Sequence, residues 1–141
     1  MGEIKTYKDL HAWQVGMETM TLTYALTADF PLEERYGLTA QMRRASLSIP
    51  SNVAEGDAVV MPRWTLRYVV TAIGSSLELE TQLEAAVRLK YVSREHAKPL
   101  ADSIDRVQKL LYGMRREKLR RLGMKGAATG AFLLAVFRVF T

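Results

Sequence analysis

Three carboxylates and two arginines are the side chains in this sequence that could form a reactive or ion-paired cluster. Glu78 and Glu80 lie two residues apart, and Glu55 precedes them in the chain. Paired carboxylates are the usual means of general acid–base catalysis, but acids this close to an apolar stripe also need partners, because an unpaired buried charge is costly. We favour an inter-helix ion-pair network for Glu55, Glu78 and Glu80, with Arg43 and Arg44 as the expected partners.

Other motifs of catalysis, metal binding or phosphate binding are absent from the sequence. The two histidines, His11 and His96, belong to neither a Glu-x-x-His nor a His-Glu-x-x-His motif. The chain has no cysteine, which excludes disulfides, thiolate metal sites and a cysteine nucleophile. The glycines near the C-terminus follow no strand and lack the Lys-Ser/Thr ending of a phosphate-binding loop. We therefore expect no enzymatic activity, no metal and no cofactor.

Basic residues gather toward the C-terminus. The formal net charge is +5, but the seven basic residues and one acidic residue from Arg115 onward carry +6, and residues 1–114 carry −1. This asymmetry favours a polyanionic partner, RNA, DNA or a membrane surface, with a solvated helix end as the alternative. The candidate phosphate-binding residues are Arg43, Arg44, Arg63, Arg67, Arg115, Arg116, Lys118, Arg120, Arg121 and Lys125.

Apolar residues that recur at three- and four-residue spacing predict four helices, at about residues 9–30, 34–55, 62–90 and 93–114. Asp9 and Ser93 are the expected N-caps, Pro50 predicts a kink inside the second helix, and Gly56 predicts its exit. The expected buried stripes are Leu10, Trp13, Met17, Met20 and Tyr24; Leu38, Met42, Ala45, Ile49 and Val53; Leu66, Val69, Val70, Ile73, Leu77, Leu83 and Val87; and Leu100, Ile104, Val107, Leu111 and Met114.

Strand signals are absent, so the expected fold class is all-α, an antiparallel up-down-up-down four-helix bundle. Residues 1–114 would form the bundle domain, and residues 115–141 a basic and then apolar C-terminal tail. The apolar run at 131–140 is shorter than the ~20 residues that a membrane-spanning helix needs. The N-terminus lacks the apolar core of a secretory signal, which favours a cytoplasmic location.

Two segments resemble a known family. The first reads Phe-Pro-Leu-Glu-Glu-Arg-Tyr-Gly-Leu-Thr-Ala-Gln-Met-Arg-Arg-Ala at 30–45 and continues as Ser-Ile-Pro-Ser-Asn-Val-Ala-Glu-Gly at 48–56. The second reads Gly-Ser-Ser-Leu-Glu-Leu-Glu-Thr-Gln-Leu at 74–83, with Ser76 where the family usually has a larger apolar residue. Over about residues 6–114 the chain resembles the bacterial 23S rRNA intervening-sequence proteins, a four-helix-bundle family related to the accessory variability proteins of diversity-generating retroelements.

This resemblance implies a ring-like homo-oligomer, a pentamer, that works with nucleic acid in a ribosomal context or beside a reverse transcriptase. Apolar residues off the main stripes, Val15, Leu22, Leu26 and Leu47, also favour assembly, because a monomer would leave them exposed. The sequence thus predicts a non-enzymatic oligomer that binds nucleic acid, RNA more than DNA, by charge and shape. The alternative is a structural or adaptor oligomer with a protein partner and no direct binding to nucleic acid.

Overall fold

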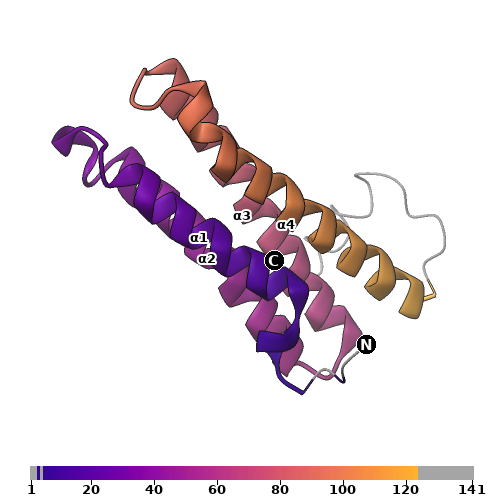
Figure 1. Cartoon of the computed structure of the whole chain (residues 1–141). Coiled ribbons are helices and arrows are strands. Elements are labelled where there is room, and N and C mark those ends of the chain that lie inside the picture. The colour runs from indigo at the N-terminus through magenta and orange to yellow at the C-terminus, as the bar shows by residue number, and fades with distance from the viewer. Residues whose placement is uncertain (1–2, 4, 124–141) are drawn as a thin grey trace, which may run out of the picture.

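Four α-helices make up most of the part of the chain that the computed structural model describes, residues 3 and 5–123. No strand occurs within that part, which confirms the all-α prediction. Figure 1 shows the helices packed side by side along a common direction. The elements in chain order are the 3-10 turn η1 (Tyr7–Asp9), α1 (His11–Thr27), the 3-10 turn η2 (Leu32–Glu34), α2 (Leu38–Ala58), α3 (Pro62–Arg88) and α4 (Arg94–Arg121).

Each helix packs against the next one in the chain, and α1 also packs against α4. Where α1 meets α2, Gly16 lies against the ring of Pro50, whereas Thr27 at the end of α1 accepts a hydrogen bond from Arg43. Residue numbers therefore rise along α1 as they fall along α2, so these two helices run in opposite directions. Figure 1 shows that the α1–α2 and α3–α4 connections lie at one end and that the α2–α3 connection lies at the other.

The core between the helices is mostly aliphatic. Its largest fully buried hydrophobic side chains are Met42, Ile49, Leu79, Leu100, Ile104, Leu111, Val53, Val69 and Val107. Except for Leu79, all of these lie on the stripes predicted for the second, third and fourth helices. Leu77 was expected on the third stripe but is 43% exposed, so α3 buries Leu79 in its place.

The predicted buried face of the first helix is wrong. The core-facing side of α1 consists of small residues and threonines, among them Thr19, Thr23 and Thr27, whereas the predicted stripe is only half-buried and Tyr24 is exposed. Each of these threonine hydroxyls donates to the carbonyl four residues earlier, at 2.8 Å. With the hydroxyl satisfied, the side chain is buried at little cost and helices can approach α1 closely.

Three of the four residues expected to lie exposed outside the stripes do not behave as predicted. Val15 belongs to the buried core, and Leu22 and Leu26 are half-buried and pack against it. Only Leu47, at 40% exposure, lies on the surface as expected. The argument for assembly from off-stripe apolar residues is therefore weaker than the sequence indicated.

Two predicted helix ends also change. Asp9 is not the N-cap of α1: its carboxylate accepts from the backbone N–H of Thr6 and closes a capping box around η1. Gly56 does not end α2, which runs through Pro50 and continues to Ala58. Gly56 is buried inside the helix, and a Cβ there would lie 3.0 Å from the Cβ of Tyr68 in α3. Its lack of a side chain serves the close approach of α2 and α3.

Glu34 determines where α2 begins. The helix starts at Leu38 rather than near residue 34. The Glu34 carboxylate accepts a hydrogen bond from the backbone N–H of Leu38 at 2.8 Å, which a longer helix would direct to the backbone carbonyl of residue 34. The hydroxyl of Tyr91 donates to the same carboxylate at 2.9 Å, which ties the α1–α2 connection to the α3–α4 connection. Ser93 caps α4 as predicted, by accepting from the backbone N–H of His96.

Candidate nucleic-acid interface

The densest group of candidate residues lies on the last turns of α4. Residues 115–121 are all helical, because they are good helix formers and basic side chains are favourable near a helix C-terminus. The side chains of Arg116, Arg120 and Arg121 are exposed, and the guanidinium of Arg115 lies 4.9 Å from the ring centroid of Tyr112. Lys125, the tenth candidate, lies outside the described residues.

A single acid offsets part of this charge. The Glu117 carboxylate accepts from Arg120 at 2.9 and 3.0 Å and from Arg121 at 2.8 Å. These hydrogen bonds, first from Arg120 and then from Arg121, lower the pKa of Glu117 to about 2. The carboxylate is therefore ionised across the physiological pH range. It forms ion pairs with two of the five basic residues at 115–121.

Arg63 and Arg67 lie at the same end of the bundle as this basic group. Gln108 of α4 donates to Glu80 of α3 at 3.1 Å, which fixes how the two helices are aligned. Arg67 precedes Glu80 by as many residues as Arg121 follows Gln108. Because α3 and α4 run in opposite directions, the two arginines lie at the same level of the bundle, and Figure 1 shows the start of α3 beside the lower half of α4. The Arg67 guanidinium also lies 5.9 Å from the ring centroid of Trp64.

The N-terminal segment adds Lys5 and Lys8, because η1 packs against α1 and α2 near the α2–α3 connection. We define the basic end as the surface formed by Lys5, Lys8, Arg63, Arg67 and the basic residues of 115–121. Residues 3–11, 55–67 and 115–121 contain nine basic and five acidic residues. The rest of the described bundle contains nine basic and ten acidic residues, so the positive charge is concentrated at one end.

Arg43 and Arg44 do not belong to the basic end. Arg43 faces α1, where it donates to the Thr27 hydroxyl at 2.9 Å and lies 4.6 Å from the ring centroid of Tyr24. Arg44 is exposed on the outer side of α2. The two adjacent arginines thus point in different directions, and Arg43 contacts α1 and not the expected carboxylates of α3.

The expected ion pairs of Glu55, Glu78 and Glu80 are not found in the described part of the chain. All three side chains are exposed, so they lack the burial that would demand a counter-ion. Gln82 donates to Glu78 at 3.0 Å, and Gln108 donates to Glu80 at 3.1 Å. The predicted network assumed buried carboxylates that need a counter-ion. Because these carboxylates are exposed, water stabilises their charge and no ion pair is required.

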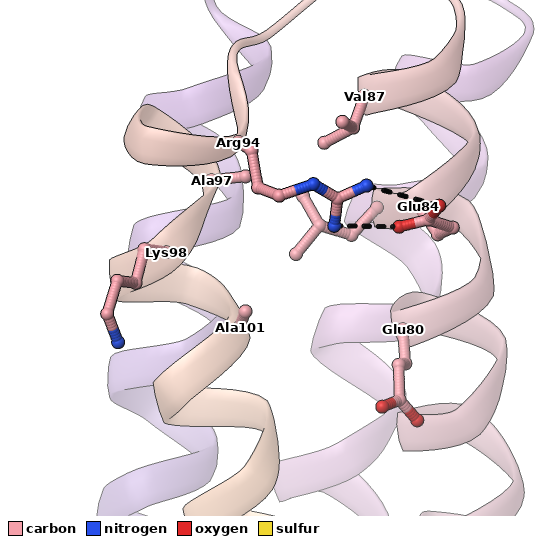
Figure 2. A pocket seen from close by; sticks show the side chains of 8 residues that line it. Glu80, Glu84, Val87, Arg94, Ala97, Lys98 and Ala101 are labelled. Atoms are coloured by element: carbon pink, nitrogen blue, oxygen red, sulfur yellow. Dashed lines mark hydrogen bonds and ion pairs between the residues drawn. The ribbon is translucent and has the colours of Figure 1, made fainter.

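A groove between α3 and α4 holds a different ion-pair cluster (Figure 2). Arg94 donates to both oxygens of Glu84, at 3.2 and 3.4 Å, and Arg88 donates to it at 2.9 Å. These contacts, that with Arg88 first, lower the pKa of Glu84. Glu80 lies about one turn away in Figure 2 and takes no part in the pair. The carboxylate of Glu84 in this groove is thus already ion-paired, and the side chains beneath it are apolar. The groove does not present a pair of groups arranged for general acid–base catalysis.

The described residues also lack any group of three or more His, Asp or Glu side chains that could hold a metal ion. None of the helices within residues 5–123 has the length and apolar character that a bilayer crossing requires.

The sequence matches the family model of the 23S rRNA-intervening sequence protein over residues 8–113. The chain belongs to this family. A crystal structure from Bacteroides thetaiotaomicron, of a protein with unknown function from the S23 ribosomal protein family, is similar at a TM-score of 0.67. It shares 19% sequence identity with this chain, and the match covers 74% of this chain and 97% of that one, so the likeness shows a common fold. The search among curated proteins found no match.

In this member of the 23S rRNA-intervening sequence protein family, the basic end is only partly inside the matched region. Arg63 and Arg67 fall within residues 8–113, whereas residues 115–121 follow it on the same helix. Sequence reasoning missed two features of this surface. Glu117 offsets Arg120 and Arg121, which its spacing of three and four residues could have indicated. Val60 and Met61 project beside Arg63, which no periodicity could indicate because they lie in a connection.

Proposed function

We propose that this protein is a non-enzymatic, cytoplasmic homo-oligomer, an up-down-up-down bundle that binds nucleic acid through its basic end, RNA in preference to DNA. The observation that carries this proposal is the gathering of Arg63, Arg67 and residues 115–121 at one end of a bundle whose remaining surface is nearly neutral. Membership in a family described by an rRNA intervening sequence supports RNA and a ribosomal context. The sequence resemblance to accessory proteins of retroelements implies a reverse transcriptase as the alternative partner.

Recognition by charge and shape follows from the side chains available. Guanidinium groups donate to phosphate oxygens with good geometry, and such contacts carry little sequence information. Arg116, Arg120 and Arg121 are exposed on one helix end, and Arg63 and Arg67 add a second strip on α3. Neutralised phosphates release counter-ions, so binding of this kind weakens steeply as salt rises.

Assembly would multiply this modest charge. Outward-facing Leu47 on α2 and Leu77 on α3, both about 40% exposed, are aliphatic side chains that a subunit contact would cover. In a closed ring of five subunits, each weak basic end becomes one of five linked sites, and linked sites bind far more tightly than single ones. Light scattering at micromolar concentration tests this: a pentamer mass supports the ring, and a monomer mass contradicts it.

The binding test uses the full chain and fluorescence anisotropy with labelled RNA and DNA duplexes of equal length. We expect RNA binding at low salt, with a log–log salt slope of about −0.7 to −0.9 per phosphate contacted. Arg63→Glu with Arg67→Glu should reduce affinity strongly. The control, Arg88→Glu with Lys90→Glu, makes the same charge change at the opposite end and should have little effect. Equal losses in both variants would contradict a localised site, and absence of binding at low salt would contradict the proposal.

The second candidate function is an adaptor that binds a protein. Leu32 and Tyr36, in the α1–α2 connection, are 86% and 85% exposed, and Leu89 is exposed in the α3–α4 connection at the same end. Exposed apolar groups of this kind are typical of protein contacts. If RNA and DNA both fail to bind, this end is the surface to test, by replacing Leu32 and Tyr36 with serine and comparing the proteins captured from cell extract.

A further inference from the structure

The α2–α3 connection exposes large apolar side chains at the basic end. Val60 is 95% exposed and Met61 is 60% exposed. The hydroxyl of Thr65 donates to the carbonyl of Val59 at 3.0 Å, which anchors the backbone on both sides of these residues. Trp64, at the start of α3, is also partly exposed. We call Val60, Met61 and Trp64 the apolar tip.

Two arginines adjoin the apolar tip in the chain. Arg63 lies between Met61 and Trp64 in the chain, and Arg67 follows one turn later. The last turns of α4 end at the same end of the bundle (Figure 1). Glu55 and Asp57 also lie nearby on α2, but basic residues outnumber acidic ones by nine to five over this end.

The opposite end has comparable apolar exposure but less net positive charge. Leu32 and Tyr36 are as exposed as the tip, and their connection contains Asp29, Glu33 and Glu34 against a single Arg35. With the α3–α4 connection included, residues 28–37 and 88–94 contain four basic and three acidic residues, a net charge of +1, whereas nine basic and five acidic residues give the basic end +4. This difference provides an internal control for what the charge does.

We propose that the basic end docks on the surface of an anionic lipid bilayer. Val60, Met61 and Trp64 would enter the headgroup region, while the flanking arginines contact lipid phosphates. Phosphate contacts with nucleic acid, the kind of binding proposed above, would engage the arginines but would leave Val60 and Met61 exposed to water. A bilayer surface offers both, since apolar side chains beside basic ones bind membranes by burial and by attraction to anionic lipid. Tryptophan also favours the membrane–water interface.

The sequence beyond α4 contains a second apolar segment. Residues 131–140 contain nine apolar residues and one arginine. This segment lies outside the described residues, and the proposal rests on the tip and the charge.

Flotation with lipid vesicles tests the proposal on the full chain. We expect binding at low salt to vesicles that contain phosphatidylserine, weak binding to phosphatidylcholine alone, and loss of binding as salt rises. Val60→Ser with Met61→Ser should lower the partition coefficient by about tenfold or more. Leu32→Ser with Tyr36→Ser, the control at the opposite end, should leave it unchanged. Circular dichroism verifies that each variant is folded.

A spectroscopic measurement reports on insertion directly. The chain has two tryptophans, so in a Trp13→Phe background the emission comes from Trp64. We expect this emission to shift to the blue with phosphatidylserine vesicles and not with phosphatidylcholine vesicles. An unshifted spectrum in the presence of bound vesicles would contradict insertion of the tip.

The two binding proposals are separated by the same variants. Val60→Ser with Met61→Ser should retain RNA affinity, because it changes no charge, whereas Arg63→Glu with Arg67→Glu should weaken binding to both partners. RNA binding without vesicle binding would overturn the lipid proposal alone. Truncation after Gly123 completes the test: if it abolishes vesicle binding while the serine variant binds normally, the C-terminal segment and not the tip contacts lipid, and the proposal is wrong.

Discussion

The hydroxyl of Thr19 in α1 lies 2.8 Å from the hydroxyl of Ser103 in α4, and both side chains are almost completely buried. Thr19 also donates its single hydroxyl proton to the carbonyl of Val15 at 2.8 Å, so Ser103 is the donor between the two hydroxyls. This hydrogen bond links α1 to α4 inside the bundle, and its contribution to stability depends on both members being present.

Removing one member should therefore cost more than removing both. Thr19→Val leaves the Ser103 hydroxyl buried without its acceptor, and we expect the free energy of unfolding to fall by about 1–3 kcal/mol. Adding Ser103→Ala should recover part of this loss. Urea denaturation of the two single variants and the double variant gives the coupling energy. Strictly additive losses would show that the two hydroxyls do not interact in solution.

Two glycines on neighbouring helices should respond oppositely to alanine. At Gly56 a Cβ would lie 3.0 Å from the Cβ of Tyr68, an atom that cannot move without its backbone, so Gly56→Ala should destabilise by about 1–3 kcal/mol. At Gly74, an exposed position within α3, a Cβ meets no atom within 4 Å. Gly74→Ala should therefore stabilise by about 0.5–1 kcal/mol. Thermal unfolding of both variants compares these effects directly.

Acid should weaken the connection held by Glu34. Its hydrogen bonds, first from the Leu38 backbone and then from Tyr91, lower the pKa of the Glu34 carboxyl in the folded protein. A lowered folded-state pKa stabilises the fold fully above the ordinary glutamate pKa, and this stabilisation is lost as pH falls through the lowered value. Glu34→Gln should be less stable than the wild type at neutral pH and should lose less stability on acidification. Parallel unfolding curves across the acid range would contradict this.

Neutralising Glu117 should strengthen polyanion binding. Glu117→Gln releases Arg120 and Arg121 from a carboxylate that their hydrogen bonds keep ionised down to about pH 2. We expect tighter RNA binding and a steeper salt dependence, by about 0.7–0.9 in slope for each additional phosphate contacted. Glu95→Gln, at the first turn of the same helix, makes the same charge change away from the basic end and should leave RNA affinity unaltered. Equal gains in both variants would point to net charge alone.

The helix content and three of the four buried faces could be predicted, because large aliphatic residues at helical spacing mark the core side of α2, α3 and α4. The face of α1 could not. A periodicity analysis assigns Met17, Met20 and Tyr24 to the core and treats threonine as polar. A threonine whose hydroxyl donates to a carbonyl of its own helix can instead be buried like a small apolar residue. Close packing against α4 then selects the smaller side chains.

The basic surface was predictable as a set of residues but not as an arrangement. Which side chains meet depends on how each helix is rotated, and a rotation by one residue turns a side chain by about 100°. Arg43 thus reaches Thr27 on α1, while Glu78 and Glu80 stay exposed on α3. The helix α4 continues to Arg121, beyond the predicted bundle boundary at 114. Part of the expected tail is therefore helical, and its basic side chains are held on the end of α4.

Pro50 and Gly16 meet where α2 crosses α1: a Cβ on Gly16 would lie 3.3 Å from the proline ring. The proline ring packs into the space that Gly16 leaves on the surface of α1 because it has no side chain. The ring fits at this one position along α1. Sliding α1 by a single turn would drive the ring against a larger side chain. The contact between Pro50 and Gly16 therefore sets the alignment of the two helices from within their interface, independently of the connection at residues 28–37 that joins them.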